Sequence, residues 1–266
     1  MNDATRRTVL QGATGIAVAG SQTAQAATNP GTILITGSSR GIGLEFVKKY
    51  AEDGWTVIAT ARDPAKSEQL QALAKKHKNI RLETLDVSDV KAIDALAAKL
   101  KDTPIDVLLN NAGISGGADK QKVGSIDYSV FDDVMHTNVR GPIKMAEAFT
   151  PHVAASKQKK IVSISSTEGS LTLISPRPDV NSIFYRASKS ALNMSMLNMA
   201  KALKDKNIIV TMQSPGFVQT DFVGGLRLPI MITAEQSVAM TMPIIAKLTM
   251  DDTGKYFRHT GDIAPW

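Results

Sequence analysis

The stretch TILITGSSRGIGLEFV, residues 32–47, decides the fold. It opens on a β-branched and apolar run typical of a strand, passes through Gly37, Gly41 and Gly43, and leads directly into a helix-forming segment. Glycines permit a tight turn and a close approach of the backbone to a pyrophosphate, and the N-terminus of the helix offers unpaired N–H groups to an anion. The order strand, glycine loop, helix therefore predicts a dinucleotide-binding unit.

The rest of the chain continues this alternation, with short β-branched runs between longer stretches of apolar residues at helical spacing. The expected strands are residues 32–35, 56–61, 80–85, 105–109, 160–164, 208–212 and 255–258, and the expected helices are 42–53, 65–77, 89–101, 129–150, 186–204 and 233–247. Ser88 and Thr233 are candidate helix caps. No repeat or linker divides residues 31–266, so the sequence predicts one doubly wound, Rossmann-type α/β domain with a parallel sheet of about seven strands.

Composition excludes several classes of protein and site. The chain has 266 residues and no cysteine, which excludes a disulfide scaffold, a thiolate metal site and a cysteine nucleophile. Its four histidines show no paired spacing, so we predict no metal. The net charge of +6 is dispersed, without basic residues interleaved with aromatic ones, so we expect no nucleic-acid partner.

The first thirty residues have the layout of an export signal. Paired Arg6 and Arg7 precede a mildly apolar stretch and the small-residue string Ala24-Gln25-Ala26. The arginine pair resembles the twin-arginine export motif, so residues 1–26 are predicted to be a signal peptide of a periplasmic protein, cleaved near Ala26. The stretch is too short and polar to span a bilayer, and the alternative is an ordinary extension on a cytoplasmic protein.

The end of the second strand bears on the choice of cofactor. An NAD-binding protein would carry an acidic residue there for the ribose hydroxyls, whereas this chain has Arg62. Arg62 and Arg40 provide two guanidinium groups suited to a 2′-phosphate, which favours NADP(H). Asp63, one position later, is the competing ribose ligand.

Further motifs follow in a fixed order: Asn110-Asn111-Ala112-Gly113 after the fourth strand, Asn138, Ser165-Ser166, the YxxxK pair Tyr185 and Lys189, and Pro215-Gly216. With the glycine loop, they resemble the short-chain dehydrogenase/reductase family over residues 31–266. The string ATARDP at 59–64 and the C-terminal TGKY…PW are closest to NADP-dependent carbonyl reductases of the sniffer and C-factor kind.

The resemblance implies roles for matching residues. The implied catalytic residues are Asn138, Ser166, Tyr185 and Lys189. The implied cofactor-binding residues are Gly37, Ser39, Arg40, Gly41, Ile42, Gly43, Arg62, Asp86, Val87, Asn111, Ala112, Gly113, Tyr185, Lys189, Pro215, Gly216, Val218 and Thr220. Asp86 could instead cap the following helix, and Asn138 could merely satisfy backbone groups.

Tyr185 lies directly before the predicted helix 186–204 and four residues from Lys189, so with one more helical residue their side chains share one face. A phenol with a pKa of about 10 needs a nearby cation to exchange protons at neutral pH, and Lys189 is the expected cation. Ser166 precedes Tyr185 by nineteen residues, more than the family's usual dozen or so, so residues 171–181 are an expected loop. That spacing leaves open whether Ser165 or Ser166 contacts the substrate.

The expected activity is reversible reduction of an aldehyde or ketone to an alcohol. The alternative is a dinucleotide-binding signalling protein of the C-factor type. Phe217, Phe222, Leu226, Leu228, Ile230 and Met231 predict an apolar entrance for a small carbonyl or alcohol substrate. The resemblance also implies a homodimer or homotetramer.

Overall fold

A computed structural model of the chain describes residues 30–178 and 182–266. The predicted signal segment, residues 1–26, lies outside the described residues. The seven strands are β1 (Thr32–Ile35), β2 (Thr56–Ala61), β3 (Ile80–Thr84), β4 (Val107–Asn110), β5 (Lys160–Ile164), β6 (Ile209–Gln213) and β7 (Tyr256–Phe257). All neighbouring pairs are parallel, in the order β3-β2-β1-β4-β5-β6-β7. The predicted doubly wound parallel sheet is confirmed.

The helices are α1 (Gly41–Glu52), α2 (Glu68–Lys76), α3 (Val90–Lys99), α4 (Ser129–Met135), α5 (Gly141–Ala154), α6 (Leu171–Ile174), α7 (Ile183–Ala202) and α8 (Ala234–Lys247). Thr233 caps α8 in a capping box, as its position in the sequence predicts. Ser88 does not cap α3: its hydroxyl donates to Asp86, and Asp89 takes the cap by accepting from two backbone N–H groups of the first turn.

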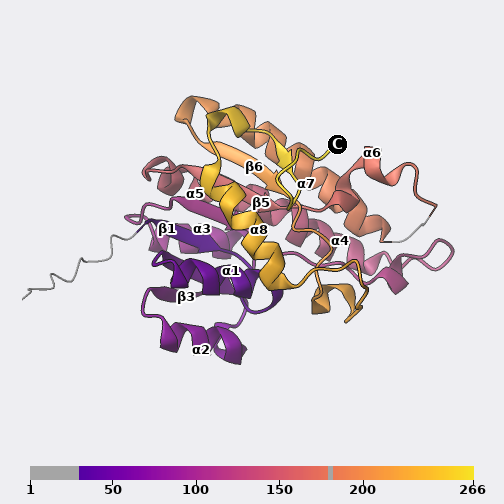
Figure 1. Ribbon diagram of the computed structural model, residues 1–266, viewed down its shortest axis with the longest axis horizontal. Coiled ribbons are helices and arrows are strands. Elements are labelled where there is room, and N and C mark those ends of the chain that lie inside the picture. Colours follow the sequence, from indigo (N-terminus) through magenta and orange to yellow (C-terminus); the bar gives the residue numbers. More distant parts are fainter. Residues whose placement is uncertain (1–29, 179–181) are drawn as a thin grey trace, which may run out of the picture.

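Helices cover both faces of the sheet, and alternate residues of β1 belong to different cores. Ile33 and Ile35 pack with α1 and α8 on one face, where Figure 1 shows these helices lying together. Leu34 packs into the opposite core with side chains of α3, α5 and α7. All three side chains are inaccessible to solvent, which explains why β1 lacks polar alternation.

One predicted helix is divided in the structure. Residues 129–150 were expected to be continuous, yet a π-helical turn, η3 (His136–Arg140), separates α4 from α5. Pro142 has no N–H to donate four residues back to Asn138, and the ladder shifts so that the Gly141 N–H donates five residues back to His136. The π turn places Asn138 in the interior.

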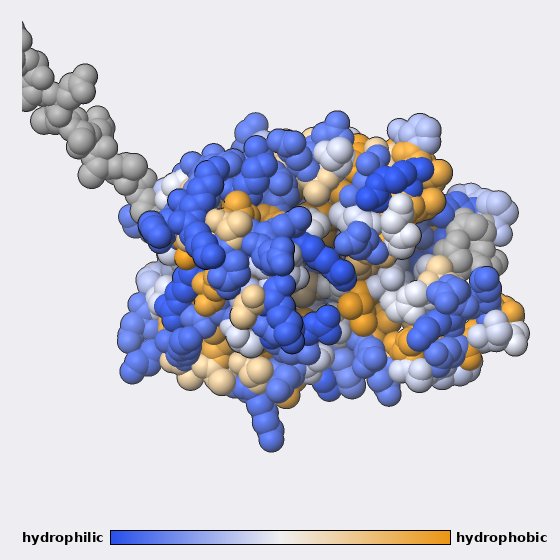
Figure 2. Space-filling model, turned by 90° about the horizontal axis from the view of Figure 1, so that it is seen from below, coloured by the Kyte–Doolittle hydropathy of each residue, from blue (hydrophilic) through white to orange (hydrophobic). Residues whose placement is uncertain are grey.

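Within the described residues, no helix is long and apolar enough to cross a membrane. The face shown in Figure 2 is mainly hydrophilic, and its hydrophobic patches are separated by hydrophilic residues.

Candidate active site

A cleft of about 710 Å³ opens where the order of strands reverses, between the carboxyl ends of β1 and β4. Crevices at such switch points are the usual ligand sites of doubly wound sheets. Every candidate cofactor and catalytic residue except Asn138 lines this cleft. Topology thus brings together residues from all parts of the sequence between 37 and 220.

The floor of the cleft is a close junction of two loops. Thr36 Oγ1 accepts hydrogen bonds from the N–H groups of Asn111 and Ala112 at 3.0 and 3.1 Å. The Asn111 amide donates to the carbonyls of Thr36 and Gly37 at 2.9 and 3.2 Å. A Cβ at Gly43 would lie 2.2 Å from the Gly37 carbonyl oxygen, so only glycine allows the first turn of α1 to approach this loop.

Arg40 and Arg62 both line the cleft, and both are exposed and without an ion-pair partner in the described part of the chain. Asp63 is engaged elsewhere: it caps the short helix η1 (Pro64–Lys66) and pairs with Lys66 at 3.0 Å. The competing acidic ligand is therefore held by its own turn, and Arg62 and Arg40 are left to face an anion.

Tyr185 and Lys189 extend from the first two turns of α7 into the cleft. Burial raises the pKa of Tyr185 to about 12, although the nearby Ser166 hydroxyl acts in the opposite direction. Burial also lowers the pKa of Lys189 to about 8. The Lys189 ammonium donates to the Ile164 carbonyl at 2.9 Å and lies 5.8 Å from the centre of the Tyr185 ring.

The pKa of Tyr185 thus differs from the expectation that Lys189 lowers it. Desolvation of the phenolate is the largest influence, and Lys189 itself carries a depressed pKa. A phenol with this pKa holds its proton at neutral pH, which is the state required for a proton donor.

The two candidate serines are directed to different neighbours. The Ser165 hydroxyl donates to Asn193 of α7 at 2.5 Å and is 2% exposed. The Ser166 hydroxyl accepts from the Glu168 N–H at 3.2 Å and lies near enough to the Tyr185 phenol to oppose the rise in its pKa. Ser166 is therefore the serine placed beside Tyr185, in agreement with the role that the family resemblance implies.

Asn138 lies below the cleft. Its Oδ1 accepts from the Ile114 N–H at 2.8 Å, and its Nδ2 donates to the Ile114 carbonyl at 2.8 Å and to the Ser188 hydroxyl at 3.0 Å. The Asn138 side chain is fully buried. It thus connects the loop after β4 to α7. Because it is buried outside the lining of the cleft, it does not contact a ligand there directly.

The remaining candidates include one corrected expectation. Asp86 binds the Ser88 N–H and hydroxyl through one oxygen, and Thr220 lies beside Gly41. Phe217 and Phe222 line the cleft, and the Phe222 ring meets Tyr185 edge-on, with 5.4 Å between ring centres. The predicted apolar entrance contains fewer residues in the structure. Met231 is buried, and Leu226, Leu228 and Ile230 do not line the cleft.

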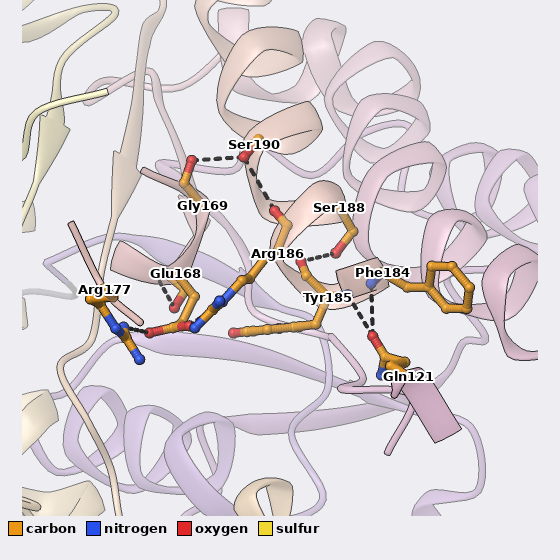
Figure 3. Close-up of polar contacts among 10 residues, drawn as sticks. Gln121, Glu168, Gly169, Arg177, Phe184, Tyr185, Arg186, Ser188 and Ser190 are labelled. Atoms are coloured by element: carbon orange, nitrogen blue, oxygen red, sulfur yellow. Dashed lines mark hydrogen bonds and ion pairs between the residues drawn. The ribbon is translucent and has the colours of Figure 1, made fainter. Parts of the chain in front are cut away.

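Two residues that sequence analysis overlooked flank Tyr185 in Figure 3. Glu168 pairs with Arg177 and with Arg186, the latter at 2.7 Å, on the side toward which the phenol points. Gln121 lies at the backbone of Tyr185, on the opposite side. The segment after Glu168, expected to be a loop, contains the four-residue helix α6.

Among residues 30–178 and 182–266, no group of three or more histidine and acidic side chains is arranged to hold a metal ion. The absence of a metal and the oligomeric state both stay predictions.

Comparisons with known proteins agree with this geometry. Residues 31–229 match the model of the short chain dehydrogenase family. An NADPH-bound carbonyl reductase from chicken fatty liver is 31% identical, with a TM-score of 0.82 over 90% of this chain and 100% of that chain. The carbonyl reductase Sniffer of D. melanogaster is 29% identical, with a TM-score of 0.80 over 89% and 99%. C-signal of Myxococcus xanthus is 31% identical over 65% of this chain and 99% of its own length.

Proposed function

Because the chain belongs to the short-chain dehydrogenase family, we propose that it is an NADP(H)-dependent reductase that converts an aldehyde or ketone to an alcohol, reversibly. The observation that carries this proposal is that Ser166 and Tyr185 line the same cleft as the glycine loop and the two arginines. Oxidoreductase chemistry is general to the family.

Two features of the cleft, and two similar proteins, support NADPH as the cofactor. The backbone junction at Gly37 and Gly43 leaves no room for a side chain, which suits close contact with a pyrophosphate. Arg40 and Arg62 supply guanidinium groups for a 2′-phosphate, and Asp63 is occupied by Lys66. The carbonyl reductase from chicken liver and a Burkholderia multivorans neighbour, 28% identical, are described with NADPH and NADP bound.

The residues of the cleft divide the chemistry among them. When bound, NADPH supplies the hydride. Ser166 donates a hydrogen bond to the carbonyl oxygen of the substrate and stabilises negative charge as it develops there. Tyr185 gives its proton to the same oxygen, and its high pKa keeps that proton in place until the oxygen becomes basic. Lys189, whose ammonium donates to the Ile164 carbonyl, would bind the nicotinamide ribose.

Apolar side chains of residues 217–223 favour an apolar substrate. Phe217, Phe222 and Val223 line the cleft, and the edge-on contact of Phe222 with Tyr185 limits access to the phenol. Such walls bind the hydrocarbon part of a small carbonyl compound while Ser166 and Tyr185 fix its oxygen.

The test is NADPH oxidation with a panel of aldehydes, ketones and quinones, run with wild type, Tyr185→Phe, Ser166→Ala and Ser165→Ala. Tyr185→Phe should bind NADPH normally and lose at least ~100-fold in turnover, because the substrate oxygen loses its proton donor. Ser166→Ala should be far more impaired than its matched control Ser165→Ala. Turnover of Tyr185→Phe within threefold of wild type would contradict the assigned acid.

The similarity to C-signal supports a second candidate, a nucleotide-binding signalling protein with little turnover. This alternative does not require a proton donor in the cleft, whereas Ser166 and Tyr185 both line it, with Ser166 beside the phenol. Tight NADPH binding without oxidation of NADPH by any compound in the panel would favour it.

A further inference from the structure

The helix that carries Tyr185 begins without a cap of its own. A typical N-cap residue has extended backbone and accepts from the N–H of the second or third helical residue. Here Ser182 occupies the cap position with a left-handed φ of 52°, and its side chain makes no capping bond. The second and third residues of α7 are Phe184 and Tyr185, so the N–H groups that need an acceptor include that of Tyr185 itself.

Gln121, far away in sequence, supplies the acceptor. Its Oε1 accepts from the Phe184 N–H at 2.7 Å and from the Tyr185 N–H at 3.2 Å, as the dashed lines of Figure 3 show. Its Nε2 donates to the carbonyls of Ser115 and Gly117, both at 2.9 Å. The side chain is 0% exposed, and these four bonds use its two donors and both lone pairs of its acceptor.

These bonds connect two walls of the cleft. Ser115 and Gly117 continue the loop from Gly113, which lines the cofactor side, and Tyr185 lies on the opposing helix. The Tyr185 carbonyl is also held, because it accepts from the Ser188 hydroxyl at 2.7 Å, and Ser188 is bonded in turn to Asn138. The peptide groups on both sides of the Tyr185 Cα are therefore fixed to the loop after β4 or to the π turn.

We propose that Gln121 is a positioning residue: it caps α7 from outside the helix and thereby sets the distance between the Tyr185 phenol and the cofactor side of the cleft. The consequence for turnover rests on the proposed function, whereas the capping itself does not. A proton donor displaced by about 1 Å can lose about 100-fold in rate, so the cap should act on kcat more than on binding.

The test compares Gln121→Met, which removes the acceptor and the donors, with Gln121→Glu, which keeps an acceptor that the N-terminus of a helix favours. Asn79→Leu is the matched control, because the Asn79 amide bridges the backbone carbonyls of Ala51 and Trp55 away from the cleft. The measurements are kcat, KM, the NADPH dissociation constant and hydrogen exchange of the Phe184 and Tyr185 amides.

Gln121→Met should lower kcat by at least about tenfold, with KM and NADPH affinity within about threefold of wild type, and its Phe184 and Tyr185 amides should lose protection. Gln121→Glu should keep that protection but lower kcat about threefold or more, because a carboxylate oxygen replaces the Nε2 that donates to the carbonyls of Ser115 and Gly117. Asn79→Leu should change stability alone. Equal kcat losses in Gln121→Met and Asn79→Leu, or unchanged amide protection in Gln121→Met, would overturn the proposal.

Two further outcomes are decisive. If Gln121→Met does not fold, Gln121→Glu decides, since a kcat equal to that of wild type, with the bonds to Ser115 and Gly117 lost, would contradict positioning by Gln121. If wild type reduces no carbonyl compound, the proposed function fails, while the exchange of the two amides still shows whether Gln121 caps α7.

Discussion

At two positions in the cleft, one of two adjacent residues is already bonded within the protein and its neighbour is available to a ligand. Asp63 is held by Lys66 while Arg62 makes no ion pair within the described chain, and Ser165 is bonded to Asn193 while Ser166 meets Tyr185. The bonds that occupy Asp63 and Ser165 thus determine which neighbour is left to face a ligand.

Replacement of Arg62 by Ala tests whether Arg62 binds the 2′-phosphate of NADPH. A guanidinium–phosphate hydrogen bond contributes roughly 1.5–3 kcal/mol, so Arg62→Ala should weaken NADPH binding by about 10-fold or more. NADH lacks the phosphate and should bind nearly as before. Titration of both nucleotides measures the ratio, and an equal loss for NADPH and NADH would show that Arg62 does not contact a phosphate.

The buried Lys189 gives the second prediction. Its pKa is about 8 in the folded chain and about 10.4 when unfolded, so between these values folding releases its proton. Burial of Lys189 therefore lowers the free energy of unfolding most below pH 8, and this loss disappears as the pH rises toward 10.4. The free energy of unfolding of wild type, relative to Lys189→Met, should therefore increase by up to about 3 kcal/mol over this range.

Urea unfolding of wild type and Lys189→Met at pH 7.5 and 9.5 measures this difference. Lys160 is also buried with a lowered pKa, but it is present in both proteins and cancels. Parallel pH dependence of the two proteins would show that Lys189 is not desolvated as described.

The individual residues also show what sequence could and could not predict. Tyr185 and Lys189 are one helical turn apart, and Gly37, Gly41 and Gly43 lie within one loop, so local spacing was sufficient to identify them. Gln121 contacts residues more than sixty positions away, and no local pattern marks it. The direction of the pKa shift of Tyr185 depends on burial, which short sequence motifs do not reveal.

At the scale of elements, strand positions were predicted to within one or two residues, because hydrophobic runs and turn residues bound each strand. The π turn before α5 was missed. Hydrophobic spacing through residues 129–150 looked continuous, and only the missing N–H of Pro142 pointed to a shifted ladder.

Gly141, at the junction of the π turn and α5, gives the third prediction. Its helical φ of −56° would suit alanine, yet a Cβ there would lie 2.7 Å from the Val87 carbonyl oxygen. Gly141→Ala should therefore lower the free energy of unfolding by about 1–3 kcal/mol, despite the better helix propensity of alanine. It should also weaken NADPH binding severalfold, because Asp86 and Val87 line the cleft.

Thermal unfolding and NADPH titration of Gly141→Ala measure both effects. A variant at least as stable as wild type would show that the strand–helix junction can relax. A destabilised variant with unchanged NADPH affinity would show that Val87 lies too far from the bound nucleotide to matter.

At the scale of the whole molecule, the predicted cleavage site near Ala26 lies six residues before the first strand, which begins at Thr32. Cleavage near Ala26 would leave β1 complete, and the Thr32 N–H donates to Asp106 at 2.9 Å at the start of that strand. Every strand of the described sheet and every residue that lines the cleft lies after this cleavage site. A twin-arginine route carries folded proteins, which suits a chain that must acquire its nucleotide in the cytosol.

Binding of NADPH before export would also stabilise the transported fold, since a ligand at 100 times its dissociation constant adds about 2.7 kcal/mol. We therefore expect wild type in the periplasm, shortened near Ala26 and able to bind NADPH, and an Arg6→Lys, Arg7→Lys double variant in the cytosol at full length. Fractionation with mass spectrometry of the N-terminus measures this, and a variant starting at residue 27, made in the cytosol, is the control for folding. Wild type confined to the cytosol with Met1 retained would show that residues 1–26 are an ordinary extension, because a functional signal would be removed during export.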